Sequence, residues 1–92
     1  MAPMNVSRDR DGGGEVLALE KMKLTVELDR EEDGRFIAEV LELPGVLVYA
    51  HTAEQAFARV QALALRVLAD KLEGGQLPES PLTVSFETSS AA

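Results

Sequence analysis

Hydrophobic and polar side chains alternate with a period of two along several short segments of the chain. The alternation is clearest from Met22 to Leu28, where every second residue is apolar, and a single apolar face is typical of a half-buried strand. Asp33-Gly34 follows, and Asp-Gly between alternating segments predicts a hairpin, because glycine supplies the positive φ of the turn. We therefore expect a return strand over residues 35–43.

Two further strands are predicted beyond this hairpin. Pro44-Gly45 interrupts the alternation, because proline lacks the N–H that a strand ladder needs and glycine permits a sharp bend. A short apolar strand over residues 46–49 follows, and alternation returns over residues 82–86.

A long helix lies between these last two strands. Thr52 and Gln55 have the spacing of a capping box, which predicts that the helix begins there. The pair Gly74-Gly75 predicts its end, because glycine is the favoured residue just after a helix. The predicted order of elements is β-β-β-α-β, which is an α+β fold.

The predicted helix carries more apolar surface than one sheet covers. On a helical wheel its apolar arc is roughly 200° wide, against about 100° for a helix that packs on a single layer. Either residues 16–19 fold back over the excess, or another chain covers it. We favour the second explanation and expect a homo-oligomer, a dimer or a tetramer, with Leu65, Leu68 and Leu72 at the interface.

Length and composition indicate one globular domain. The chain has 92 residues, of which 46% are hydrophobic and 27% are charged, and these fractions are typical of a folded protein rather than a disordered one. We expect the domain to span residues 21–87. Residues 1–20 are expected to form a flexible tail or a short extra element, and residues 88–92 a frayed C-terminus.

The charge balance narrows the classes of partner. Sixteen Asp and Glu against nine Lys and Arg give a formal net charge of -7. Such a chain repels phosphate backbones and anionic membranes, whereas it attracts a basic protein. Cysteine is absent, which excludes disulfides and cysteine-type zinc sites. With no apolar run of membrane-spanning length and no signal-peptide pattern, a cytoplasmic location is expected.

The residues that could carry chemistry do not form a catalytic constellation. His51 is the one histidine and has no second histidine or cysteine at metal-ligand spacing. The acidic run over residues 29–33 is expected to be a solvated turn rather than a cation site. Glu39 and Glu42 lie three apart on a strand and so face opposite sides. We therefore expect no enzyme activity, no cofactor and no metal.

The stretch from Asp33 to Ala56, DGRFIAEVLELPGVLVYAHTAEQA, resembles the HicB-like antitoxin family. The matching positions are Asp33-Gly34, Phe36, Ala38-Glu39, Leu43-Pro44-Gly45, Thr52, Glu54 and Ala56, with Pro78 and the last strand also fitting the pattern. The resemblance covers about residues 21–87. Val46 stands where the family often has cysteine, and Ala50 where it usually has glycine.

The resemblance implies a partial RNase H-like fold, in which a three-stranded antiparallel sheet plus an edge strand packs on one long helix. It also implies that the chain binds and neutralises a small basic HicA-type ribonuclease toxin. No C-terminal DNA-binding appendage is expected, so neither is operator binding. The contact candidates are the acidic residues of the hairpin and the helix flank, namely Glu31, Glu32, Asp33, Glu54, Asp70 and Glu73. The alternative is an orphan oligomeric domain, a scaffold or a small-ligand binder, with no toxin and no catalysis.

Overall fold

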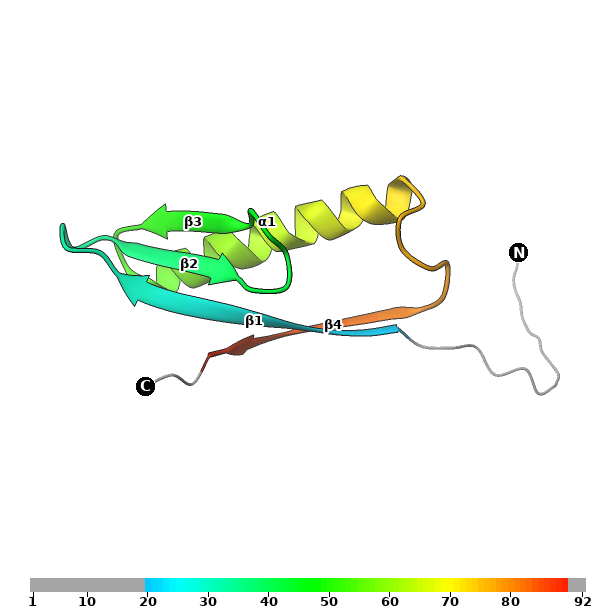
Figure 1. Ribbon diagram of the computed structural model, residues 1–92, viewed down its shortest axis with the longest axis horizontal. Helices are drawn as coiled ribbons and strands as arrows, with labels where there is room; N and C mark the ends of the chain where they lie inside the picture. The colour runs from blue at the N-terminus through cyan, green and yellow to red at the C-terminus, as the bar shows by residue number, and fades with distance from the viewer. Residues whose placement is uncertain (1–19, 90–92) are drawn as a thin grey trace, which may run out of the picture.

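The computed structural model describes residues 20–89, which form one four-stranded sheet with one helix on one of its faces (Figure 1). The elements are β1 (Glu20–Arg30), β2 (Phe36–Val40), β3 (Leu47–Ala50), α1 (Ala53–Glu73) and β4 (Leu82–Thr88). The predicted order β-β-β-α-β and the α+β class are confirmed. The predictions for residues 1–19 and 90–92 lie outside the described residues.

The strands lie in the order β3-β2-β1-β4, and the sheet is mixed. β1, β2 and β3 pair antiparallel, as expected, whereas the edge strand β4 runs parallel to β1. The reason is the length of α1. Its 21 residues span about 31 Å, which returns the chain from the end of β3 to the point where β1 begins. β4 therefore starts beside the start of β1, with Leu82 opposite Glu20.

β1 is the longest strand, and it has different neighbours along its two halves. β4 pairs with residues 20–26, and β2 pairs with residues 26–30, so that Val26 alone has a partner on both sides. α1 packs against β1, β2 and β3. The core between the two layers contains Leu24, Val26, Ala38, Val40, Leu43, Val46 and Ala50 from the sheet side and Ala56, Val60, Ala64 and Leu68 from the helix.

The two predicted turns form for the expected reasons. Gly34 has a φ of 93°, and its N–H donates to the carbonyl of Glu31 at 2.9 Å, which closes the hairpin between β1 and β2. Gly45 has a φ of 89° in the turn between β2 and β3. There the N–H of Val46 donates to the carbonyl of Leu43 at 3.0 Å.

α1 begins and ends where the capping residues predict. The Thr52 hydroxyl accepts a hydrogen bond from the Gln55 N–H at 3.0 Å, and the Gly74 N–H donates to the Asp70 carbonyl at 2.9 Å. Ala56, Val60, Ala64 and Leu68 are the buried residues of the helix.

The excess apolar surface that the wheel predicts is present on the outside of α1. Leu65 is 49% exposed and Leu72 is 44% exposed. Leu68, which the sequence groups with them at an oligomer interface, is 3% exposed and belongs to the core. The difference follows from helix geometry, because Leu68 lies one turn beyond Ala64 on the face that meets the sheet.

Candidate protein-interaction surfaces

The described residues offer no group of metal ligands. No three or more His, Asp or Glu side chains in residues 20–89 gather closely enough to hold an ion. His51 is exposed and directly precedes Thr52 at the start of α1. Within the same residues, no helix has the length and apolarity that a membrane crossing requires.

The acidic hairpin is partly neutralised by its own arginine. The Asp33 carboxylate accepts a hydrogen bond from the Arg35 backbone N–H at 3.0 Å and another from Arg35 Nε at 2.8 Å. The backbone hydrogen bond is the main cause that lowers the pKa of Asp33. The guanidinium of Arg35 also lies 4.6 Å from the centre of the Tyr49 ring, which ties the turn to β3. Glu32 is exposed and Glu31 half-buried, so these two carboxylates keep their charge available.

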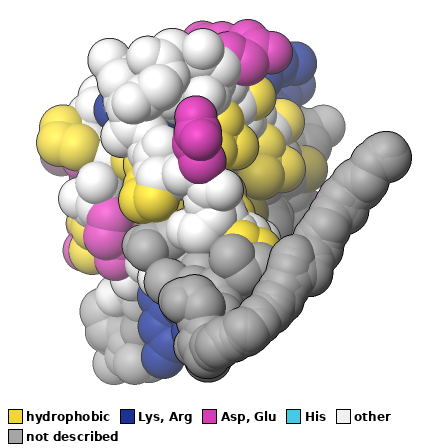
Figure 2. Space-filling model, turned by 90° about the vertical axis from the view of Figure 1, so that its right-hand side faces the viewer, with side chains coloured by type: hydrophobic (Ala, Val, Ile, Leu, Met, Phe, Trp, Pro, Cys, Tyr) yellow, Lys and Arg dark blue, Asp and Glu magenta, His cyan; other side chains and the backbone are white. Residues whose placement is uncertain are grey.

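The six acidic contact candidates do not form one surface. Glu54 lies in the first turn of α1, whereas Asp70 and Glu73 lie in its last turns, about 24 Å and about 29 Å from Glu54 along the axis. All three are exposed. The end of the molecule that holds the C-terminus of α1 presents hydrophobic side chains with acidic ones among them (Figure 2). The hairpin lies at the opposite end (Figure 1). Glu54 lies at the hairpin end, because β3 ends opposite the start of β2, so the six candidates are divided between the two ends of the domain.

The strand register creates a surface that motif reasoning missed. Side chains alternate along each strand, so those flanking the core residues point away from α1. On this side Glu39 lies between Glu27 of β1 and Leu47 of β3, and Ile37 lies between Asp29 and Tyr49. We call this the open sheet face, and define it by Glu27, Asp29, Ile37, Glu39, Leu47 and Tyr49.

The open sheet face combines accessible apolar groups with carboxylates. Tyr49 is 42% exposed and Leu47 is 37% exposed, and Leu41, just beyond β2, is 48% exposed. Glu27 and Glu39 are directly opposite each other, and like charges in that position destabilise a sheet. The signal for this surface lay in the alternation itself, at the odd-numbered positions of β1 and β2, but which residues meet across strands depends on the register.

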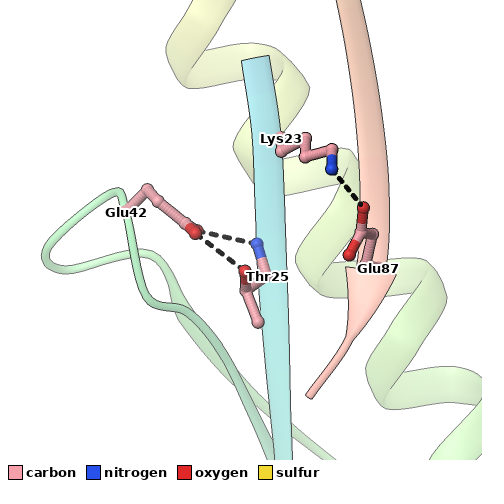
Figure 3. Close-up of polar contacts among 4 residues, drawn as sticks. All are labelled: Lys23, Thr25, Glu42 and Glu87. Carbon is pink, nitrogen blue, oxygen red and sulfur yellow. Dashed lines mark hydrogen bonds and ion pairs between the residues drawn. The ribbon is translucent and has the colours of Figure 1, made fainter. Parts of the chain in front are cut away.

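One cation lies at the edge of the open sheet face. Arg35 lies over the Tyr49 ring, but its charge is paired with Asp33, and Lys23 lies 3.6 Å from Glu87 (Figure 3). No ion pair within residues 20–89 uses Glu27, Asp29 or Glu39. The potential over the open sheet face is therefore negative.

Glu42 has a structural role at the point where β2 leaves β1. Its carboxylate accepts hydrogen bonds from the Thr25 N–H at 2.7 Å and from the Thr25 hydroxyl at 2.8 Å (Figure 3). The backbone hydrogen bond is the main cause that lowers the pKa of Glu42. The carboxylate thus satisfies a strand N–H that β2 no longer reaches. Glu39 and Glu42 therefore have different functions in the fold. The expectation that they face opposite sides does not apply to Glu42, because β2 ends at Val40 and the Glu42 carboxylate bonds the Thr25 hydroxyl.

A shallow pocket of about 310 Å³ lies between the Leu43-Pro44-Gly45 turn and α1. Leu63 and Val67 line its helix side, with Lys71 beside them. Glu42 also lines the pocket, and the Glu42 carboxylate is hydrogen-bonded to Thr25.

Comparison with known proteins gives no match. No family model fits the chain, and no curated protein or solved structure is significantly similar to it. The resemblance to HicB-like antitoxins stays a prediction that depends on the motif residues.

Proposed function

We propose that the chain is a HicB-like antitoxin module that binds and neutralises a small basic ribonuclease of the HicA type through its open sheet face. The observation that carries the proposal is the combination of exposed apolar side chains with three carboxylates on one face, and none of these carboxylates forms an ion pair among the described residues. The net charge of -7 adds long-range attraction for a cationic protein.

The chemistry of this face suits a basic partner. Tyr49 and Leu47 supply the exposed apolar area that the centre of a protein interface needs. Glu27 and Glu39 repel each other in the free chain, and an arginine or lysine placed between them relieves that repulsion. Binding is therefore coupled to the removal of an unfavourable interaction.

The family motif supports the proposal through the fold. Asp33-Gly34 forms the hairpin turn, Leu43-Pro44-Gly45 the turn between β2 and β3, and Thr52 caps α1. These motif residues are structural. We infer that the contact surface is the open sheet face, which combines exposed apolar side chains with carboxylates.

The test is co-expression with a HicA-type ribonuclease encoded beside this chain, with bacterial growth and copurification as readouts. The double variant Glu27→Lys with Glu39→Lys reverses the charge at both positions and still keeps two like charges opposite each other. Its stability should therefore stay close to that of the parent. We expect it to lose growth rescue and complex formation.

The matched control is Glu54→Lys with Asp70→Lys, which changes the net charge equally on exposed positions of α1. It should still rescue growth. The open sheet face would be overturned as the site if the Glu54→Lys, Asp70→Lys variant lost growth rescue while the Glu27→Lys, Glu39→Lys variant kept it. Absence of any complex between the parent chain and the ribonuclease would overturn the antitoxin function and favour the orphan oligomeric domain.

A further inference from the structure

The outside of α1 carries a row of apolar residues with the spacing of a coiled coil. Alternating steps of four and three residues separate its members, which matches the 3.5-residue repeat of paired helices. Every member is exposed, including the two large leucines at 49% and 44%. We call this row the outer seam, and define it by Ala58, Ala62, Leu65, Ala69 and Leu72.

We propose that the outer seam is the contact between two copies of this chain, whose α1 helices pack antiparallel. The proposal is independent of the antitoxin function. The seam extends about 21 Å along the helix, and a heptad-spaced seam is complementary to another helix of the same kind. α1 is the one helix in residues 20–89, and in this proposal the second helix is α1 of another copy.

The side chains of the seam suit close helix packing. The three alanines let two helix axes approach to about 8 Å, and Leu65 and Leu72 are large enough to fill the holes that facing residues leave. An antiparallel pair centred near Val67 brings Leu65 opposite Ala69 of the second copy, and Leu72 opposite Ala62. Large residues then meet small ones in the four layers formed by Ala62, Leu65, Ala69 and Leu72, whereas Ala58 lies opposite position 76, beyond the end of α1. The helix dipoles oppose each other favourably.

The charges beside the seam agree with an antiparallel pair. Arg59, Arg66 and Glu73 are exposed and follow the seam along one flank. No ion pair between described residues uses them, although Arg59 Nη1 donates a hydrogen bond to the Tyr49 carbonyl at 3.2 Å. In the antiparallel pair this flank meets its own copy, so Glu73 of each helix lies near Arg59 of the other, whereas the two Arg66 side chains lie near each other at the symmetry axis. Symmetry gives two attractions between Glu73 and Arg59 against one repulsion between the Arg66 side chains.

The dimer leaves the open sheet faces accessible. α1 and the open sheet face lie on opposite sides of a two-layer domain, so pairing through α1 directs both sheets outward (Figure 1).

The first experiment compares Leu65→Glu with Leu41→Glu. The two leucines are 49% and 48% exposed, but Leu65 lies on the outer seam and Leu41 on the sheet side. We expect the parent chain to sediment as a dimer at about 100 μM, Leu41→Glu to stay dimeric, and Leu65→Glu to become a monomer. Circular dichroism checks that both variants remain folded. A monomeric parent, or equal behaviour of the two variants, would overturn the proposal.

The second experiment tests the direction of the helices. Glu73→Arg makes the flank wholly basic and should raise the dimer dissociation constant at least tenfold at low salt. The triple variant Arg59→Glu, Arg66→Glu, Glu73→Arg reverses every sign and restores complementarity, so its dissociation constant should return close to that of the parent. A triple variant no tighter than Glu73→Arg alone would overturn the antiparallel arrangement.

Discussion

Removing one negative charge should have opposite effects at two glutamates that lie three residues apart. Glu42 accepts two hydrogen bonds from Thr25, at 2.7 Å and 2.8 Å. Glu39 lies directly opposite Glu27, and no ion pair among the described residues uses either of them. We predict that Glu42→Gln lowers the free energy of unfolding, whereas Glu39→Gln raises it.

The magnitudes follow from these contacts. A hydrogen bond to a charged group contributes about 1.5–3 kcal/mol when buried, but Glu42 is exposed, so solvent screening reduces the loss in Glu42→Gln to about 1 kcal/mol. Relief of a like-charge pair across a sheet is worth a few tenths of a kcal/mol, within the range of about 0.2–1 kcal/mol for cross-strand pairs. For a domain of this size, 1 kcal/mol corresponds to about 4–8 °C in Tm.

The pH dependence distinguishes the charge of Glu42 from its shape. The hydrogen bonds from Thr25 lower the pKa of Glu42 in the folded state, so their contribution to stability is present above the ordinary value of 4.5 and is lost as pH falls through the lowered folded pKa. The stability difference between the parent and Glu42→Gln should therefore be full at pH 7 and shrink below pH 4.5.

Urea unfolding, monitored by circular dichroism at pH 7 and at low pH, measures the free energy of unfolding of both variants. Equal destabilisation by Glu39→Gln and Glu42→Gln at pH 7 would refute the reasoning. It would mean that the strand register and the Thr25 contacts do not decide whether the loss of a charge raises or lowers the free energy of unfolding. A Glu42→Gln deficit that persists unchanged in acid would refute the role of the charge.

Three further predictions concern the core, the helix cap and a turn, and urea unfolding measures each. Leu24→Ala should cost about 2–5 kcal/mol, because Leu24 is 2% exposed, whereas Leu47→Ala on the open sheet face should cost less than 1 kcal/mol. Thr52→Ala should cost about 1 kcal/mol because the Gln55 N–H loses its acceptor, while His51→Ala should stay within about 0.5 kcal/mol of the parent. Gly45→Ala should cost about 1–2 kcal/mol from its φ of 89° alone, since the added Cβ meets no atom within 4 Å.

Local patterns were sufficient to predict the elements of this fold. Asp33-Gly34 determines its hairpin and Thr52 the start of α1 through contacts that span at most four residues. The parallel pairing of β4 with β1 is different, because residues some 60 positions apart form it. It depends on where the chain lies relative to β1 when it leaves α1, and no local sequence pattern predicts that position.

The candidate surfaces show the same division. The acidic residues of the hairpin and helix could be listed from the sequence, but the placement of Glu54 at the hairpin end and of Asp70 and Glu73 at the opposite end could not. Glu27 and Glu39 drew no attention as a pair, since they come together only through the register of β1 with β2. A pair of this kind is visible only after strand partners are known.

By itself, the sequence determined the α+β class, the order of the elements and the excess of apolar surface on the helix, because periodicity and capping are properties of neighbouring residues. The tertiary structure alone decided which part of that apolar arc is buried. Val26 and Val40 on the sheet draw one side of α1 inward, with Leu68 at 3% exposure, and leave Leu65 at 49% on the outside. The helix alone has apolar side chains on both sides of a wide arc, and the position of the sheet determines which side is buried in the core.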